Sequence, residues 1–410
     1  MSPDAQAAFR AALTGAGVPG AFTVTAFAQV VPRAVLDAIA EFVRVFDRVT
    51  ARPAWQQLAT RDAPPLARAP RTEACFFSAW DIHLPPGRPA DWRLIEFNDN
   101  GSGMLLAAHI NAAFHALGGT APGPAPEPPL APERLLERID AIVADEALRF
   151  FGRPAGAGFL IVDAAEVLAG GRFRAELDLL GADWRRRGRT VVIAAPEELH
   201  WDGTRLSARG VPVEFVVNRC TDFHWEGGAF AALRAAYASG TVYVAPNPFS
   251  YATRSDKATL ALLSRADRDA ETGITAAERA VLRARVPETL LLDRDNVAAI
   301  AARKHAYFFK PAHGFASHGV HAAAEVGAAR LRRLLRDGVP YVAQALVPKA
   351  TAADPASGRT LWTDLRVWAW RGEILMLSGR ASTHPHRVAL APPGGWIPTY
   401  AGARGAPDAG

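Results

Sequence analysis

Cysteine is scarce in this chain: the 410 residues hold only Cys75 and Cys220, which are too few for a disulfide framework. The sequence also has no apolar run of the length that spans a bilayer, and its first residues lack the basic and apolar regions of a secretory signal. We therefore expect a reduced, cytoplasmic setting and no membrane partner.

The excess of positive charge is also small, because 46 basic and 41 acidic residues leave a formal net charge of +5. The most compact basic cluster, residues 185–189, suits the solvated end of a helix. A modest charge spread along the chain does not predict a nucleic-acid surface, although it favours anionic ligands. Half of the residues are hydrophobic, which is enough for two or three packed domains in a chain of this length.

The segment from Tyr307 to Val320 reads YFFKPAHGFASHGV. Its apolar start predicts a buried strand that ends on Lys310, because Pro311 cannot donate a hydrogen bond to a central strand. The loop that follows contains Gly314 and Gly319, so its backbone N–H groups can approach an anion closely. A phosphate-binding lysine with its loop is one interpretation, and a plain hairpin with a solvated lysine is the other.

Two β-like runs joined by a Pro-Pro-Gly turn predict an antiparallel hairpin that ends at Asn98. In its second strand, a period of two places Glu96 and Asn98 on one face and Ile95 and Phe97 on the other. Asp81, on the first strand, can lie opposite them. Two carboxylates and an amide oxygen form a hard donor set that suits magnesium held together with nucleotide phosphates. The alternative is an exposed polar face on a two-stranded ribbon.

The middle of the chain predicts a mainly parallel sheet covered by helices, because strands and helices alternate from about residue 159 to residue 244. Asn218, Arg219 and Asn247 follow apolar strands, where ligands gather in such sheets, although solvated loops would look the same. A Pro/Gly-rich linker over residues 118–131 precedes this section.

Beyond the central lysine we expect a helix over 325–336, a strand over 341–349 and a loop over 351–359. A strand pair over 361–370 and 373–378 follows, and its first strand places Asp364 and Arg366 on one face. An arginine there can stabilise phosphoryl charge during transfer. His384 and His386 could suggest a metal pair, but without a third ligand nearby they favour a loop at the acceptor pocket.

The order of these motifs resembles that of the ATP-grasp ligases, in their circularly permuted branch of glutathionylspermidine synthase-like and eukaryotic glutathione synthetase-like enzymes. In the usual order the Glu-x-Asn motif closes the chain, whereas here it comes first. The resemblance extends from about Arg71 to Thr399. It rests on Asp81 with Glu96-Phe-Asn98, Asn247-Pro with Asp256-Lys257, Phe309-Lys310-Pro, Val342-Ala-Gln344-Ala-Leu-Val and Asp364-Leu-Arg366-Val.

The resemblance implies an α/β ATP-grasp fold with a mainly parallel, three-layer domain. It implies N-terminal helices, the permuted metal-binding hairpin and the linker in residues 1–134, and a substrate-side α/β domain in 135–250. The nucleotide-binding subdomains would occupy 251–400, and 401–410 would form a disordered tail.

The resemblance also implies roles for individual residues. Mg²⁺ would be bound by Asp81, Glu96 and Asn98. ATP would be contacted by Lys257, Lys310, Gly314, Ser317 and Gly319 at its phosphates and by Gln344, Ala345, Leu346 and Val347 at its base. The transferred phosphoryl group would be stabilised by Arg366 and Arg380. Four positions depart from the family pattern: Ala79 stands where an arginine is common, Ala345 stands where an acid is common, and His313 and His318 occupy loop positions where acidic or basic residues are more usual.

The activity that the resemblance implies is an ADP-forming carboxylate-amine ligase, which activates an acid as an acyl phosphate and transfers it to an amine or another nucleophile. A nucleotide-binding regulatory protein without turnover and a phosphotransferase that stops at the phosphorylated substrate are the alternatives. The expected partners are a small carboxylate and a small amine. Neither is identified by the sequence, which also leaves the oligomeric state open, a homodimer included.

Overall fold

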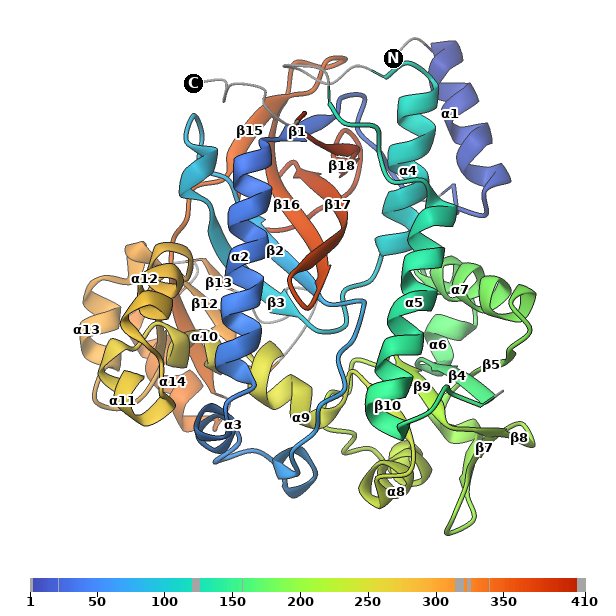
Figure 1. Cartoon of the computed structure of the whole chain (residues 1–410). Coiled ribbons are helices and arrows are strands. Elements are labelled where there is room, and N and C mark those ends of the chain that lie inside the picture. The colour runs from blue at the N-terminus through green and yellow to red at the C-terminus, as the bar shows by residue number, and fades with distance from the viewer. Residues whose placement is uncertain are drawn as a thin grey trace.

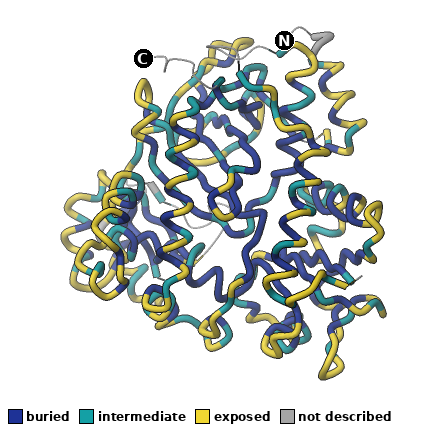
Figure 2. The backbone as a smooth tube through the Cα atoms, viewed as in Figure 1, coloured by how far each residue is buried: buried dark blue, intermediate teal, exposed yellow. Residues whose placement is uncertain are grey.

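The computed structural model of the chain describes residues 3–20, 22–119, 126–156, 158–313, 321–322, 326–338 and 340–403. The fold is α/β, with three larger sheets flanked by helices (Figure 1). Buried residues follow the strands and the helix faces that cover them, while the outer turns are exposed (Figure 2). Among the described residues, no helix is long and apolar enough to cross a membrane.

The largest sheet has six strands, which come from both ends of the chain. Its order is β18-β17-β16-β2-β3, with β15 paired to β16, and all pairs are antiparallel. The strands are β2 (Ala79–His83), β3 (Arg93–Asn98), β15 (Ala350–Ala353), β16 (Thr360–Trp370), β17 (Glu373–Ser382) and β18 (Gly395–Ile397). The two predicted strand pairs are confirmed, and the central contact between β2 and β16 places Asp81 opposite Arg366.

Helix α2 (Arg33–Thr50) covers one face of this sheet. The apolar side of this helix is buried and packs against Trp80, Leu365 and Val367 of the strands. Phe46 and Trp80 meet edge to face with ring centroids 4.8 Å apart. Because successive strand residues point to opposite faces, Asp81 and Arg366 project from the other side of the sheet.

The predicted parallel sheet is confirmed, with strands in the order β10-β9-β4-β5. They are β4 (Gly158–Val162), β5 (Thr190–Ala194), β9 (Phe215–Asn218) and β10 (Tyr243–Ala245). One face packs against helices α4 (Met104–Ala116), α5 (Pro132–Phe151) and α7 (Arg174–Arg186). The other face packs against α8 (Ala231–Ser239) and a small sheet of β6 (Leu199–Trp201), β7 (Leu206–Ala208) and β8 (Val211–Val213), so this part has three layers.

The third sheet has the order β11-β14-β12-β13 and is antiparallel. Its strands are β11 (Thr289–Leu291), β12 (Tyr307–Pro311), β13 (His321–Ala322) and β14 (Tyr341–Ala345). Helices α13 (Val297–Ala302) and α14 (Ala328–Arg336) cover the face that carries Tyr307 and Phe309. The opposite face of β12 therefore presents Phe308 and Lys310 toward the six-stranded sheet.

Shorter elements complete the chain. The helices are α1 (Pro3–Gly15), α3 (Pro53–Ala59), α6 (Ala165–Leu168), α9 (Pro248–Ser250), α10 (Lys257–Leu263), α11 (Asp269–Thr272) and α12 (Ala276–Arg285). The strands are β1 (Gln29–Val31), β6 (Leu199–Trp201), β7 (Leu206–Ala208), β8 (Val211–Val213) and β19 (Thr399–Ala401).

Three details differ from the sequence-based expectation. The loop predicted over 351–359 contains part of β15, because alternating small residues there pair with β16. Strand β12 continues through Pro311, which is tolerated because only β14 adjoins it at that point among the described residues. Ala401, expected to begin a disordered tail, ends β19, which pairs in parallel with β1. The tail residues 404–410 lie outside the described residues, and so do residues 120–125 of the linker predicted over 118–131.

The alternation predicted for β3 is wrong at Ile95. The register passes from Asp81 opposite Glu96 to Ile82 opposite Leu94, so Ile95 is the extra residue of a β-bulge. Ile95 consequently lines the same cavity as Glu96 instead of facing the core with Phe97. A bulge depends on the partner strand and therefore has no signature in the strand's own sequence.

Candidate functional site

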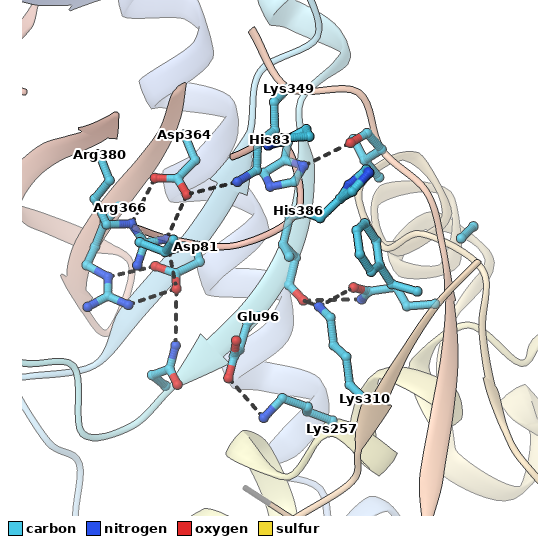
Figure 3. Close-up of a pocket in the computed structure, with 18 of the residues that line it drawn as sticks. Asp81, His83, Glu96, Lys257, Lys310, Lys349, Asp364, Arg366, Arg380 and His386 are labelled. Atoms are coloured by element: carbon cyan, nitrogen blue, oxygen red, sulfur yellow. Dashed lines mark hydrogen bonds and ion pairs between the residues drawn. The ribbon is translucent and has the colours of Figure 1, made fainter. Parts of the chain in front are cut away.

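A cavity of about 330 Å³ lies between the polar face of the six-stranded sheet and the sheet that contains β12 and β14 (Figure 3). Ten of the residues predicted from the sequence line it: Asp81, Glu96, Asn98, Lys257, Lys310, Gln344, Ala345, Val347, Arg366 and Arg380. Its walls hold six Lys/Arg side chains and three Asp/Glu side chains, which gives a net charge of +3 with histidines neutral. Such a cavity favours an anionic ligand.

Asp81 lies at the centre of an ion-pair network on the sheet. Nε and Nη2 of Arg366 donate to its two carboxylate oxygens at 2.7 and 2.8 Å, and Nη2 of Arg380 lies 3.2 Å from Oδ2. Burial by itself raises the pKa of Asp81, but the two guanidinium groups hold that pKa well below its usual range. Arg380 also donates from Nε to Asp364 at 2.8 Å, so both predicted catalytic arginines are fixed by carboxylates.

Glu96 forms an ion pair with Lys257, whose Nζ lies 3.0 Å from Oε1. Lys257 is the first residue of α10, and Asp256 caps that helix by accepting a hydrogen bond from the N–H of Ala258 at 2.8 Å. A lysine in the first turn opposes the helix dipole, and the partner on β3 accounts for its position. Asp256 also contacts Nδ1 of His313 at 2.7 Å and raises the pKa of that histidine.

Lys310 is buried at the end of β12 and points toward β3. Its Nζ donates to Oε1 of Gln344 at 2.7 Å and approaches the carbonyl oxygen of Ile95 at 3.5 Å. Gln344 in turn donates to the same Ile95 oxygen at 3.2 Å. The carbonyl group of the bulged residue Ile95 thus accepts hydrogen bonds from two side chains of the neighbouring sheet. Burial lowers the pKa of Lys310 to about 8, and the nearby charge of Lys257 acts in the same direction.

The segment predicted to contact the nucleotide base only partly faces the cavity. Gln344, Ala345 and Val347 line it, whereas Leu346 is 42% exposed and donates its backbone N–H to Ala306 at 2.9 Å. The carbonyl oxygen of Val347 accepts a hydrogen bond at 3.0 Å from Nδ1 of His83. Burial lowers the pKa of His83 to about 4, so its ring is neutral near pH 7.

Several lining residues were missed by the sequence analysis. Lys349, which follows Pro348 in the segment after β14, lies 3.9 Å from Asp364 and has its pKa lowered by burial. In the sequence, Lys349 was marked only by its position at the end of a predicted strand. His83 lies two residues after Asp81 on β2 and was detectable only as a polar residue near a strand end. Arg172, just before α7, had no local signal.

The remaining candidates are in the loop after Lys310 and in the segment that contains His384 and His386. Gly314, Ser317 and Gly319 fall outside the described residues, so their proximity to a phosphate stays a prediction. His386 lines the cavity and meets the ring of Phe308 edge to face at 5.1 Å. Within the described parts of the chain, no three His, Cys, Asp or Glu side chains are grouped as a metal site.

The three residues predicted to bind magnesium match that role only in part. Asp81, Glu96 and Asn98 offer hard oxygen donors on neighbouring strands, which suits Mg²⁺. Both oxygens of Asp81 already accept hydrogen bonds from arginines, and Asn98 donates to one of them at 3.5 Å. Glu96 and Asn98 are therefore the residues that match a magnesium ion carried with nucleotide phosphates, because such an ion needs only one or two carboxylates from the protein. The metal role of Asp81 stays a prediction.

The polar residues at the ends of the parallel strands line none of the cavities described, and their side chains serve the fold. Asn247 caps α9 and Asn218 accepts a hydrogen bond from the N–H of Cys220, so both serve the local backbone. Arg219 is 4% exposed and donates to Oγ of Ser102 at 2.6 Å. Its Nη2 also lies 3.6 Å from Oε2 of the buried Glu176, while Nε and Nη1 have no hydrogen-bond partner in the described part of the chain.

Comparison with protein-family models gives no match, and no curated protein matches the sequence. Among solved structures, a glutathione synthetase-like effector from Globodera pallida in its apo form aligns over 97% of this chain and 96% of its own, with a TM-score of 0.61 and 10% identity. A putative gamma-glutamylcysteine synthetase from Methylobacillus flagellatus aligns over 87% and 84%, with a TM-score of 0.47 and 12% identity. The first likeness shows a shared fold over nearly the full length of both chains.

Proposed function

We propose that this chain, whose α/β fold is of the ATP-grasp type that the sequence predicted, is an ATP-dependent ligase. It would convert a carboxylate to an acyl phosphate with release of ADP, and an amine or another nucleophile would then displace the phosphate. The observation that carries the proposal is the convergence of Glu96, Lys257, Lys310 and Arg366 on one cavity of net positive charge.

The four groups have complementary tasks in such a reaction. Lys257 and Lys310 are placed to contact the nucleotide phosphates from two different elements, a helix start and a strand end. Lys310 is buried, so its charge acts in a weakly screened environment and attracts a phosphate strongly. Arg366 holds Asp81 with two of its donors and would place its positive charge beside the transferred phosphoryl group, where negative charge is redistributed during transfer.

Magnesium would be held by Glu96 and Asn98 together with the phosphates, and it would neutralise charge between nucleotide and acid. The remaining steps belong to the chain itself. The acid must approach from the side of Arg366, and its oxygen forms the bond to the γ-phosphorus as the bond to ADP breaks. The amine then attacks the acyl carbon, loses a proton and expels phosphate.

Calorimetric titration with Mg-ATP tests the nucleotide site. We expect the wild-type chain to bind, and Lys310→Ala and Glu96→Ala each to weaken binding by about tenfold or more, since losing one charge-assisted contact costs at least about 1.4 kcal/mol. The matched control is Lys304→Ala, because this lysine donates to Val326 at 3.0 Å and does not line the cavity. Equal affinities in all four proteins would show that the nucleotide site is placed wrongly.

Product analysis then separates the ligase from the two alternatives. Incubation with Mg-ATP and a panel of acids and amines should release ADP and give an amide-like product. Binding without ADP release would indicate a regulatory protein, and a stable phosphorylated acid would indicate a phosphotransferase.

A further inference from the structure

Lys349 lines the candidate nucleotide cavity but has no part in the proposed reaction. It stands two residues beyond Val347, directly after the segment expected to contact the nucleotide base. Its side chain is only 10% exposed, so its ammonium group has lost most of its contact with water. Burying a charged group is unfavourable unless hydrogen-bond partners replace the lost water. An ammonium group in this position therefore needs acceptors close by.

The described part of the chain gives Lys349 no such acceptor. Its ion pair with Asp364 joins Nζ and Oδ2 at 3.9 Å, which is longer than a hydrogen bond. Both oxygens of Asp364 already accept hydrogen bonds from Arg380, from Nε at 2.8 Å and from Nη2 at 3.0 Å. Burial lowers the pKa of Lys349 although Asp364 acts in the opposite direction.

The ion-pair network around Lys349 contains one cation too many (Figure 3). Lys349, Arg366 and Arg380 share two carboxylates, those of Asp81 and Asp364, so these five groups carry a net charge of +1. Arg366 donates to both oxygens of Asp81, and Arg380 donates to both oxygens of Asp364. Lys349 is therefore the member of this network whose charge is left for a ligand.

The neighbouring lysines indicate the class of that ligand. Lys257, Lys310 and Lys349 all line the cavity. Burial lowers the pKa of Lys310, and the charges of Lys257 and Lys349 lower it further, so the three ammonium groups lie within electrostatic reach of one another. A ligand with several linked negative charges relieves the repulsion between them, whereas one carboxylate offers a single charge.

We propose that Lys349 is a third phosphate-contacting lysine of this cavity, beside Lys257 and Lys310. The proposal rests on the proposed function, because it takes the linked anion to be the phosphates of the nucleotide. The place of Lys349 directly after the segment expected to contact the base agrees with this choice, since the acid would approach from the side of Arg366.

Calorimetric titration with Mg-ATP, in the absence of acid and amine, tests the proposal. Lys349→Met removes the charge and keeps most of the side-chain length, and it should weaken binding by about tenfold or more, because one charge-assisted contact is lost. Lys349→Arg retains the charge and should bind within about threefold of the wild type. The matched control is Lys304→Met, which makes the same change at a lysine outside the cavity and should leave the affinity unchanged.

The melting temperature of each variant shows whether it is folded, and Lys349→Gln replaces Lys349→Met should the latter unfold. Wild-type affinity in Lys349→Met would overturn the proposal, including the case in which that variant changes only the KM for the acid. A loss in Lys349→Arg as large as that in Lys349→Met would also overturn it, because the charge would then not be what binds.

Failure of the proposed function gives a different result. If the wild-type chain does not bind Mg-ATP, both proposals are overturned. If the wild type binds and Lys310→Ala weakens binding while Lys349→Met does not, the nucleotide site stands and only the role of Lys349 is overturned.

Discussion

The lowered pKa of Lys310 predicts that nucleotide binding takes up a proton. In the ligand-free protein, burial lowers this pKa from 10.5 to about 8. Each pKa unit is worth about 1.4 kcal/mol, so the folded protein disfavours the charged lysine by about 3 kcal/mol. A phosphate placed beside Nζ reverses this preference, because an opposite charge within a few ångströms stabilises the ammonium form. The pKa of Lys310 therefore rises when nucleotide binds.

The size of the uptake follows from the titration curve. At pH 8 about half of the ligand-free molecules carry a neutral lysine, so binding should take up about half a proton; at pH 7 the figure falls to about a tenth. Above pH 8 the affinity itself should fall, by up to about tenfold per pH unit, since protonation must then precede binding. The effect has one sign: raising the pH removes the charge that the phosphates require.

Calorimetry in two buffers of different ionisation enthalpy measures the uptake directly. Wild-type protein at pH 8 should show it, Lys310→Met should not, and Lys304→Met should behave as wild type because that lysine lies outside the cavity. Binding without proton uptake at pH 8 in the wild type would refute the reasoning, and so would an uptake that persists in Lys310→Met. The first result would mean that Lys310 is charged before nucleotide arrives.

Three further substitutions test the surroundings of the site. Gly103→Ala should destabilise the fold by about 1–3 kcal/mol in urea unfolding, because φ is +101° there and a Cβ would lie 2.3 Å from the ring of Trp396; unchanged stability would mean that this turn adapts freely. Glu146→Ala should cost about 3–5 kcal/mol in the same assay, because four donors, a guanidinium among them, lose their buried acceptor; a loss below about 1 kcal/mol would contradict this. Arg366→Lys should lower ATP turnover by about tenfold or more, because a lysine cannot reproduce the two-pronged contact with Asp81; unchanged turnover would show that a point charge suffices there.

The local patterns in the sequence were sufficient to predict the strands that form the site. Alternation around Glu96 and Arg366 predicted β3 and β16, and the proline after Lys310 marked the end of β12 to within one residue. Residues that lie at strand ends or strand centres on a polar face could be chosen as candidates for this reason. The glycines after Lys310 gave an equally clear local signal, but they lie outside the described residues.

Contacts between distant segments were not predictable in the same way. The sequence contains no local sign that Asp81 would accept hydrogen bonds from Arg366, 285 positions later, because this depends on the pairing of β2 with β16. The bulge at Ile95 likewise arises from a register shift between two strands. Lys349 was missed because its role depends on Asp364, which approaches it only in the folded chain.

These long-range pairs bear on how the proposed nucleotide cavity would bind its ligand. In the ligand-free chain, Lys257 is paired with Glu96 and Arg366 with Asp81, so two of the groups expected to contact phosphate already have carboxylate partners. For nucleotide to bind at this site, Lys257 and Arg366 would have to exchange a carboxylate partner for a phosphate. Magnesium could then neutralise the charge of Glu96 once Lys257 contacts a phosphate. Lys310 differs because its partners are an amide oxygen and a carbonyl, which carry no charge. It can therefore gain a phosphate without releasing a carboxylate, and for this reason its substitution should weaken nucleotide binding more than substitution of Lys257.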